Sequence, residues 1–192
     1  MRIAFVLGNG QSRLAVDLEL LRQRGRIYGC NALYRDFTPD VLVATDPEIS
    51  RAIQESGYAL ENVFYTRRPL PNLGARSLDR YHYGYSSGPN ALAIAIKDGM
   101  EKIFMLGFDL DSPTKKFNNV YADTEFYKKS TQEETYYGNW VKQVAEIIKG
   151  QRCQIVRIND QNVFPEPWRN KMRQATMREF LDAINNNKLE AL

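Results

Sequence analysis

A short apolar run followed by a glycine-rich turn opens the chain and constrains its fold most strongly. Residues 3–7 are five consecutive apolar residues, too few for a buried helix and typical of a strand covered on both faces. Gly8-Asn9-Gly10 interrupts this strand, and Gln11-Ser12 leads into a segment with helical spacing. Such a turn allows a phosphate or a nucleotide sugar to approach the backbone. An ordinary tight turn between a strand and a helix is the alternative interpretation.

The same alternation of strands and helices continues along the chain. We expect further strands at 26–30, 41–44, 62–65, 102–106 and 153–158, and helices at about 13–21, 47–56, 90–96, 131–149 and 168–184. This order predicts one domain over residues 1–192, with an α/β, Rossmann-like fold, a mostly parallel sheet and helices on both faces. Two stretches, about 66–85 and 110–130, break the pattern, and we expect them to form loops or lids.

The composition is typical of a globular protein and gives no sign of a nucleic-acid partner or a membrane span. With 192 residues and a net charge of +3, the chain suits one globular domain, and its scattered basic residues do not indicate a nucleic-acid partner. Cys30 and Cys153 each fall in an expected strand, which predicts reduced core residues of a cytoplasmic protein. We expect neither a signal peptide nor a transmembrane segment, because no apolar run is long enough. The single histidine, His82, is expected at the surface of a loop.

Polar residues follow several of the expected strands or precede the buried helix. Ligands bind outside the carboxyl ends of parallel strands, so these residues should lie along one crevice: Asn9, Ser12, Asn31, Asp46, Ser86, Ser87, Gly88, Asp109 and Asn159. Asp109 and Asp111 have the spacing of a divalent-cation site, but solvated loop charges are the favoured interpretation, and we predict no resident metal.

Five segments match the motifs of a known family in order and spacing. They are the turn Leu7–Ser12, Cys30-Asn31 with Tyr34, the long segment Ser86–Asp109, Val120–Asp123, and Tyr136–Asn139. Together they resemble the bacterial sialyltransferases of glycosyltransferase family 42. Those enzymes transfer sialic acid from CMP-sialic acid on a single Rossmann-like domain without a metal.

The resemblance implies roles for individual residues. Asn9 and Asn31 would contact the phosphate, the ribose or the sugar, and Ser87 and Gly88 would hold the nucleotide or the sugar carboxylate at a helix N-terminus. Tyr121 and Tyr136 would donate hydrogen bonds to the departing phosphate. The full set implied to bind the nucleotide or sugar is Gly8, Asn9, Gly10, Ser12, Asn31, Asp46, Ser86, Ser87, Gly88, Gly107, Asp109 and Asp111.

At three positions the sequence differs from the family's motifs, and these positions include the general base and a phosphate-binding residue. Asn139 stands in place of the histidine that is the family's general base, and an asparagine is not a useful base near neutral pH. Asp111 replaces a phosphate-binding tyrosine, and Asp46 replaces an asparagine. The general base is therefore unassigned.

Three hypotheses follow. The first is a nucleotide-sugar-binding protein related to sialyltransferases, acting as a metal-independent glycosyltransferase with a CMP-sugar donor. The second rests on a similarity of the glycine turn and Gly107-Phe108-Asp109 to the archaeal hydroxymethylpterin pyrophosphokinase group, and is a Mg-dependent, ATP-using phosphotransferase with Asp46, Asp109 and Asp111 near the metal. The third is a non-catalytic nucleotide-binding protein. By analogy with the family's tetramers, the segment 66–85 could instead pack against another copy in a homo-oligomer.

Overall fold

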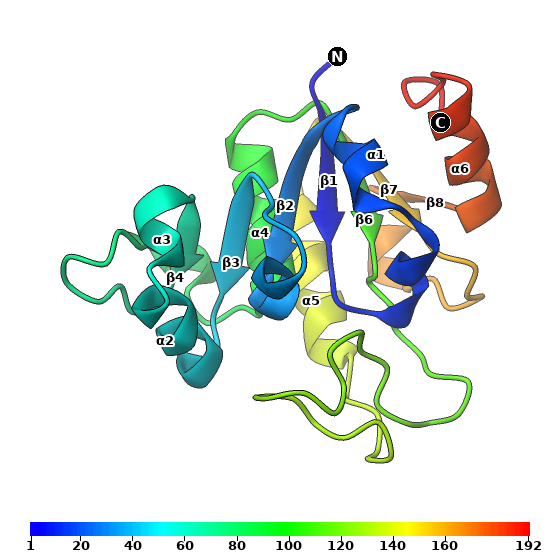
Figure 1. Ribbon diagram of the computed structural model, residues 1–192. Coiled ribbons are helices and arrows are strands. Elements are labelled where there is room, and N and C mark those ends of the chain that lie inside the picture. Colours follow the sequence, from blue (N-terminus) through cyan, green and yellow to red (C-terminus); the bar gives the residue numbers. More distant parts are fainter.

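The centre of the structure is a sheet of eight parallel strands (Figure 1), which confirms the predicted α/β class. The computed structural model describes all residues from Met1 to Leu192. The strand order is β5-β4-β3-β2-β1-β6-β7-β8. The strands are β1 (Ile3–Leu7), β2 (Arg26–Cys30), β3 (Val41–Ala44), β4 (Phe64–Thr66), β5 (Arg76–Ser77), β6 (Lys102–Leu106), β7 (Gln154–Ile158) and β8 (Arg173–Ala175).

The order of the strands changes direction once, between β1 and β6. It builds β1 to β5 outward on one side and then returns to place β6 on the other side of β1. The register pairs Ile3 with Lys102 and Leu7 with Leu106, so β1 and β6 end at the same level. Ligands of open parallel sheets bind at such a switch point, outside the carboxyl ends of the strands.

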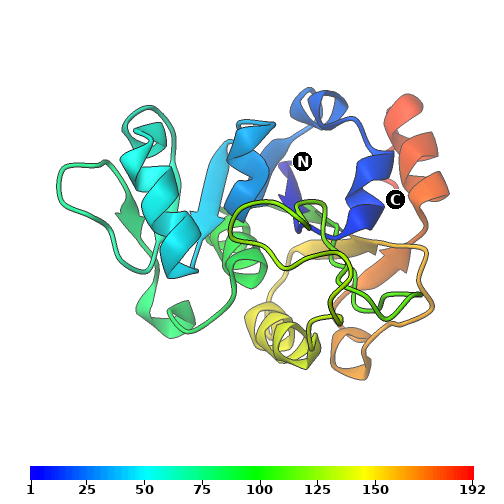
Figure 2. The ribbon, with the colours of Figure 1, turned by 60° about the horizontal axis from the view of Figure 1, so that its bottom comes forward.

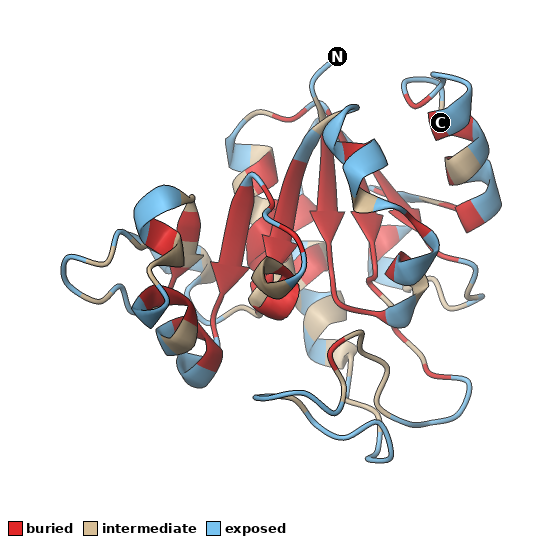
Figure 3. Ribbon diagram, in the orientation of Figure 1, coloured by how far each residue is buried: buried red, intermediate tan, exposed pale blue.

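Helices cover both faces of the sheet, and the inner strands between them are buried, whereas the edge strands β5 and β8 are largely exposed or half-buried (Figure 3). On one face Phe5, Leu7 and Phe104 form a core with Phe180, and on the other Val6 and Met105 belong to a second core. This alternation follows from the opposite directions of successive side chains in a strand. The first core includes α1 (Leu18–Arg22), α2 (Pro47–Glu55), α3 (Tyr58–Glu61) and α6 (Met177–Asn185), and the second includes α4 (Ser87–Lys97) and α5 (Gly138–Ile148).

Three of the predicted helices have different bounds in the structure, and capping side chains account for two of these differences. The helix expected at 13–21 is a 3-10 helix, Gln11–Ala15, followed by α1, because the Asp17 carboxylate accepts a hydrogen bond from the Glu19 backbone N–H and starts a new helix there. The helix expected at 131–149 begins only at Gly138. The helix expected at 168–184 begins at Met177, where Thr176 and Glu179 form a capping box.

The residues before that capping box form β8, an edge strand that the sequence pattern missed. β8 has only three residues, Arg173-Gln174-Ala175, and pairs with β7. The stretch 66–85 holds the short strand β5 and a 3-10 helix, Arg80–His82. Residues 110–130 contain no helix or named strand and pass across the carboxyl ends of the strands (Figure 2). No helix combines the length and hydropathy needed to cross a membrane.

Two glycines make the close approach of β1 and β6 possible. Gly107 has a φ of 70°, and a Cβ atom on it would lie 2.6 Å from the Gly8 carbonyl oxygen. A Cβ atom on Gly8 would in turn lie 2.5 Å from the Gly107 carbonyl oxygen. The glycines at the two strand ends are therefore required by backbone packing.

We expect Gly107→Ala to lower the free energy of unfolding by about 3 kcal/mol or more, because it combines a left-handed backbone with a collision. Gly150→Ala is the matched control, since Gly150 has a φ of 76° with no atom near its Cβ position. That variant should lose only about 1 kcal/mol. Urea denaturation measures both, and equal losses would contradict the packing argument.

Candidate functional site

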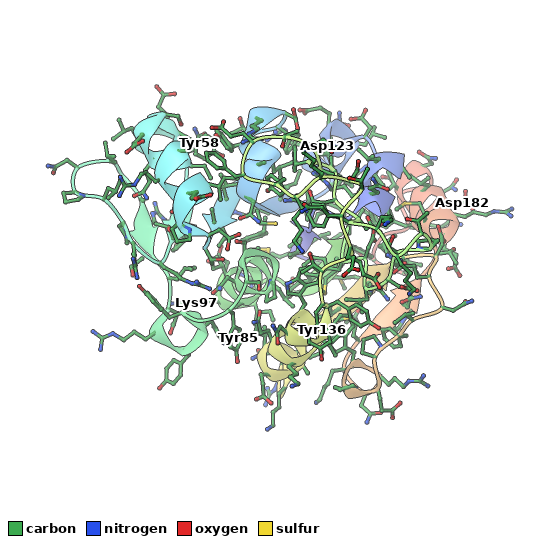
Figure 4. All side chains as sticks on the ribbon, turned by 90° about the horizontal axis from the view of Figure 1, so that it is seen from below. Tyr58, Tyr85, Lys97, Asp123, Tyr136 and Asp182 are labelled. Carbon is green, nitrogen blue, oxygen red and sulfur yellow. The ribbon has the colours of Figure 1, made fainter.

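A cavity lies at the carboxyl ends of β1, β2, β3 and β6, beside the first turn of α4. This inner cavity has a volume of about 290 Å³. A larger outer cavity, of about 580 Å³, is lined by residues of the 110–130 segment and by Tyr137 and Trp140. Both cavities are lined by Asn31, Asp46, Asp109, Asn118, Asn119 and Trp140, so they form one cleft. Figure 4 views the molecule from this edge of the sheet.

The structure brings most of the predicted binding residues together in this cleft. The inner cavity is lined by Gly8, Asn9, Gly10, Asn31, Asp46, Ser86, Ser87, Gly88, Gly107 and Asp109. Asp111 lines the outer cavity. Ser12 and Asn159 do not line either cavity, and both hydrogen-bond to Asp109.

Asn9 lines the inner cavity and has an unused hydrogen-bond acceptor. Its side chain is 7% exposed, and its Nδ2 donates to the Cys30 carbonyl oxygen at 3.3 Å. Its Oδ1 is buried and has no hydrogen-bond partner. A buried polar atom without a partner costs free energy unless a ligand or water satisfies it.

A network of hydroxyl and amide groups joins three elements at the base of the inner cavity. Ser87 Oγ donates to Asn31 Oδ1 at 2.8 Å and accepts a hydrogen bond from the Thr45 backbone N–H at 3.0 Å. Asn31 has a φ of 53°, a left-handed conformation that asparagine tolerates better than most residues. The ends of β2 and β3 are thus tied to the start of α4.

The first turn of α4 presents hydrogen-bond donors to the inner cavity. The backbone N–H groups of Ser87 and Gly88 make no hydrogen bond within the protein. The Ser86 backbone N–H is held by Gln143 Oε1 of α5 at 2.9 Å. Free N–H groups and the partial positive charge of a helix N-terminus favour an anion.

The carboxylate of Asp109 is hydrogen-bonded within the protein. It accepts hydrogen bonds from the Ser12 backbone N–H at 3.0 Å, from Ser12 Oγ at 2.5 Å and from Asn159 Nδ2 at 2.7 Å. A Cβ atom on Gly10 would collide with this carboxylate. Asp109 therefore fixes the glycine turn after β1 to the ends of β6 and β7.

The charges lining the cleft are mainly negative. The carboxylates are those of Asp46, Glu48, Asp109, Asp111 and Glu134, and the cation is Lys128. Lys115 neutralises part of this charge, with Nζ at 2.5 Å from Asp111 and 3.6 Å from Glu134. The hydrogen bond from Lys115 also lowers the pKa of Asp111. Asp46 has no hydrogen-bond partner for its carboxylate and does not cap α2.

Three predicted catalytic residues lie outside the cleft. Tyr121 is buried, its hydroxyl accepts a hydrogen bond from Arg13 Nη2 at 3.3 Å, and burial raises its pKa to about 12. Tyr136 is 71% exposed beside the start of α5 (Figure 4), and Asn139 is also exposed. His82 lies in a different depression, beyond the start of α4.

The predicted site residues do not include the aromatic wall of the outer cavity. Tyr137 and Trp140 line it, together with Phe117, Phe126 and Tyr127. The missing information was the start of α5 at Gly138, which turns Tyr137 and Trp140, rather than Tyr136 and Asn139, toward the cleft.

Comparison with known proteins adds no relative. No family model matches the chain, no curated protein matches it, and no solved structure matches it.

We expect Asp109→Ala to lower the free energy of unfolding by about 3 kcal/mol, because it leaves the donors of Ser12 and Asn159 without an acceptor. Asp111→Ala is the control at a neighbouring, half-buried carboxylate that pairs with Lys115, and it should change stability much less. Chemical denaturation of both variants is the measurement. A small loss for Asp109→Ala would show that the turn does not depend on this carboxylate.

Proposed function

We propose that the chain binds a nucleotide or a nucleotide sugar in the cleft at the carboxyl edge of the sheet. The observation that carries this proposal is the meeting of two unsatisfied features in the inner cavity. The free N–H groups of Ser87 and Gly88 favour binding of an anion, and the buried Oδ1 of Asn9 lacks a hydrogen-bond donor. A nucleotide sugar supplies both, because its phosphate is anionic and its sugars carry hydroxyl groups.

The two parts of the cleft suit the two parts of such a ligand. In this arrangement the phosphate lies against the first turn of α4, and a sugar hydroxyl donates to Asn9. The nucleobase then lies in the outer cavity against Tyr137 and Trp140, whose rings offer stacking surfaces. The resemblance to the family 42 sialyltransferases favours a CMP-sugar donor among these ligands.

We further propose that the reaction is transfer of the sugar to a hydroxyl group. The acceptor oxygen forms a bond to the anomeric carbon as the bond from that carbon to the phosphate oxygen breaks, and CMP leaves. The proton of the hydroxyl passes to Asp46, because this carboxylate lines both cavities and has no partner within the protein. A positioned carboxylate is a common general base.

The excess of carboxylates supports a second candidate, a Mg-dependent phosphotransferase that uses ATP. A phosphate near Asp46 and Asp109 needs a counter-charge, and Mg²⁺ is commonly held by one or two carboxylates together with substrate phosphates. No group of three or more His, Cys, Asp or Glu residues is placed to hold a metal ion. A bound metal in this reading depends on the nucleotide, and Asp46 and Asp109 are the residues that would hold it.

A thermal-shift panel separates these candidates. The ligands are CMP, CDP, UDP, GDP and ATP, each with and without magnesium. A ligand at ~100 times its dissociation constant adds about 2.7 kcal/mol to the stability of the folded state. A shift with CMP that is independent of magnesium supports the first proposal, and a shift only with ATP and magnesium supports the second. The absence of any shift contradicts both.

We expect Asp46→Asn to keep CMP binding but to lower the transfer rate by at least about 100-fold, because the amide accepts no proton. The measurement is donor consumption in the presence of an acceptor, with CMP binding measured in parallel. Glu48→Gln, which removes a neighbouring carboxylate of the outer cavity, is the control and should retain most of the rate. Binding without turnover in the unchanged protein would favour a non-catalytic nucleotide-binding protein.

A further inference from the structure

A second concave site lies beside the cleft, between α2 and the segment that follows β4. This arginine pocket has a volume of about 260 Å³ and is lined by Arg51, Arg67 and Arg68. No aspartate or glutamate lines it. It therefore has the opposite charge to the neighbouring cleft.

The three guanidinium groups have no anionic partner in the protein. None of Arg51, Arg67 and Arg68 forms an ion pair. Arg67 Nη2 donates to the Tyr85 carbonyl oxygen at 2.9 Å, while its Nε is buried without a partner. Three unpaired cations around one hollow repel each other, and an oxyanion with two negative charges relieves this repulsion.

Buried polar residues fix the backbone that carries these arginines. Gln54 is 1% exposed; its Nε2 donates to the Arg68 carbonyl oxygen at 3.4 Å, and its Oε1 accepts from the Leu70 backbone N–H at 2.7 Å. Ser50 Oγ and Thr66 Oγ1 are 2.5 Å apart. These bonds hold the segment after β4 against α2, so the pocket is formed before any ligand binds.

The arginine pocket shares two lining residues with the cleft. Thr45 lines the inner cavity and the arginine pocket, and Pro47 lines the outer cavity and the arginine pocket. Asp46 lies between them in the chain. A ligand anchored in the arginine pocket thus has the rest of its structure next to Asp46.

We propose that the arginine pocket binds the phosphate group of a phosphorylated second substrate, the molecule that accepts the transferred group; the acceptor role rests on the proposed function. Guanidinium groups match phosphate oxygens in geometry and form short, charge-assisted hydrogen bonds with them. The hydroxyl group of Tyr83 at the same pocket adds a donor for an oxyanion. The nucleotide cleft and the arginine pocket then hold the two substrates of one reaction on either side of Asp46.

Calorimetric titration with glucose 6-phosphate, inorganic phosphate and acetate at constant ionic strength tests the proposal. The variant is R51Q/R68Q, because both side chains are exposed and their loss should not disturb folding. R178Q is the control, since Arg178 is an exposed arginine on α6, which packs near the opposite edge of the sheet. We expect the unchanged protein and R178Q to bind the sugar phosphate, and R51Q/R68Q to bind it about tenfold more weakly or worse.

Several results would overturn the proposal. They are no binding of the sugar phosphate, equal binding by R51Q/R68Q and R178Q, and acetate binding as tightly as phosphate. A sugar phosphate that binds no more tightly than inorganic phosphate would overturn the assignment of a substrate and leave a site for the free ion.

The CMP thermal shift of the same variants separates this inference from the proposed function. A normal CMP shift in R51Q/R68Q with lost sugar-phosphate binding supports both. Arginine-dependent phosphate binding in a protein that does not respond to any nucleotide would overturn the proposed function and the acceptor role, and would leave the phosphate site standing.

Discussion

The cleft depends on one partly buried group of hydrogen bonds, those of the Asp109 carboxylate. Its bonds to Ser12 and Asn159 join the ends of β1, β6 and β7, three strands that are far apart in the sequence. Arg157 stabilises the segment that carries Asp109, because its Nε donates to the Phe108 carbonyl oxygen at 3.1 Å. Its Nη1 also donates to the Val163 carbonyl oxygen at 2.6 Å. Burial lowers the pKa of Arg157 to about 10. The side chains of Asp109 and Arg157 therefore hold the loops around the cleft in place through hydrogen bonds.

The sheet was predictable where strands are apolar and buried on both faces. Residues such as Ile3–Leu7 and Lys102–Leu106 form unbroken apolar or nearly apolar runs, and both are strands at the predicted bounds. The polar edge strand β8 was not predictable, because Arg173-Gln174-Ala175 has no alternating or apolar pattern. It is a strand only through its pairing with β7. The helix starts at Met177 and Gly138 were missed because a capping side chain or an irregular loop sets them, whereas periodicity reports only the apolar face.

The polar half of the cleft was predictable from strand ends, since parallel strands must bring their carboxyl ends to one edge. Asn9, Asn31 and Ser87 come together for this reason. The aromatic half was not predictable, because the loop that carries Phe117 and Tyr127 has no periodic pattern. Nor does the sequence reveal that Gly8 and Gly107 face each other, since they lie on strands paired only in three dimensions.

The pairing of β1 with β6 also has a consequence for how the protein is made. β1 leaves the ribosome before the other strands of this sheet, yet its partner on one side is about 100 residues further along the chain. Until then β1 presents an open apolar edge, while β2 to β5 can already assemble on its other side. Closing such a distant pair is slow, and an unpaired edge invites association with other chains. The half-built sheet is thus the stage of biosynthesis at which this chain is most exposed to association with other chains.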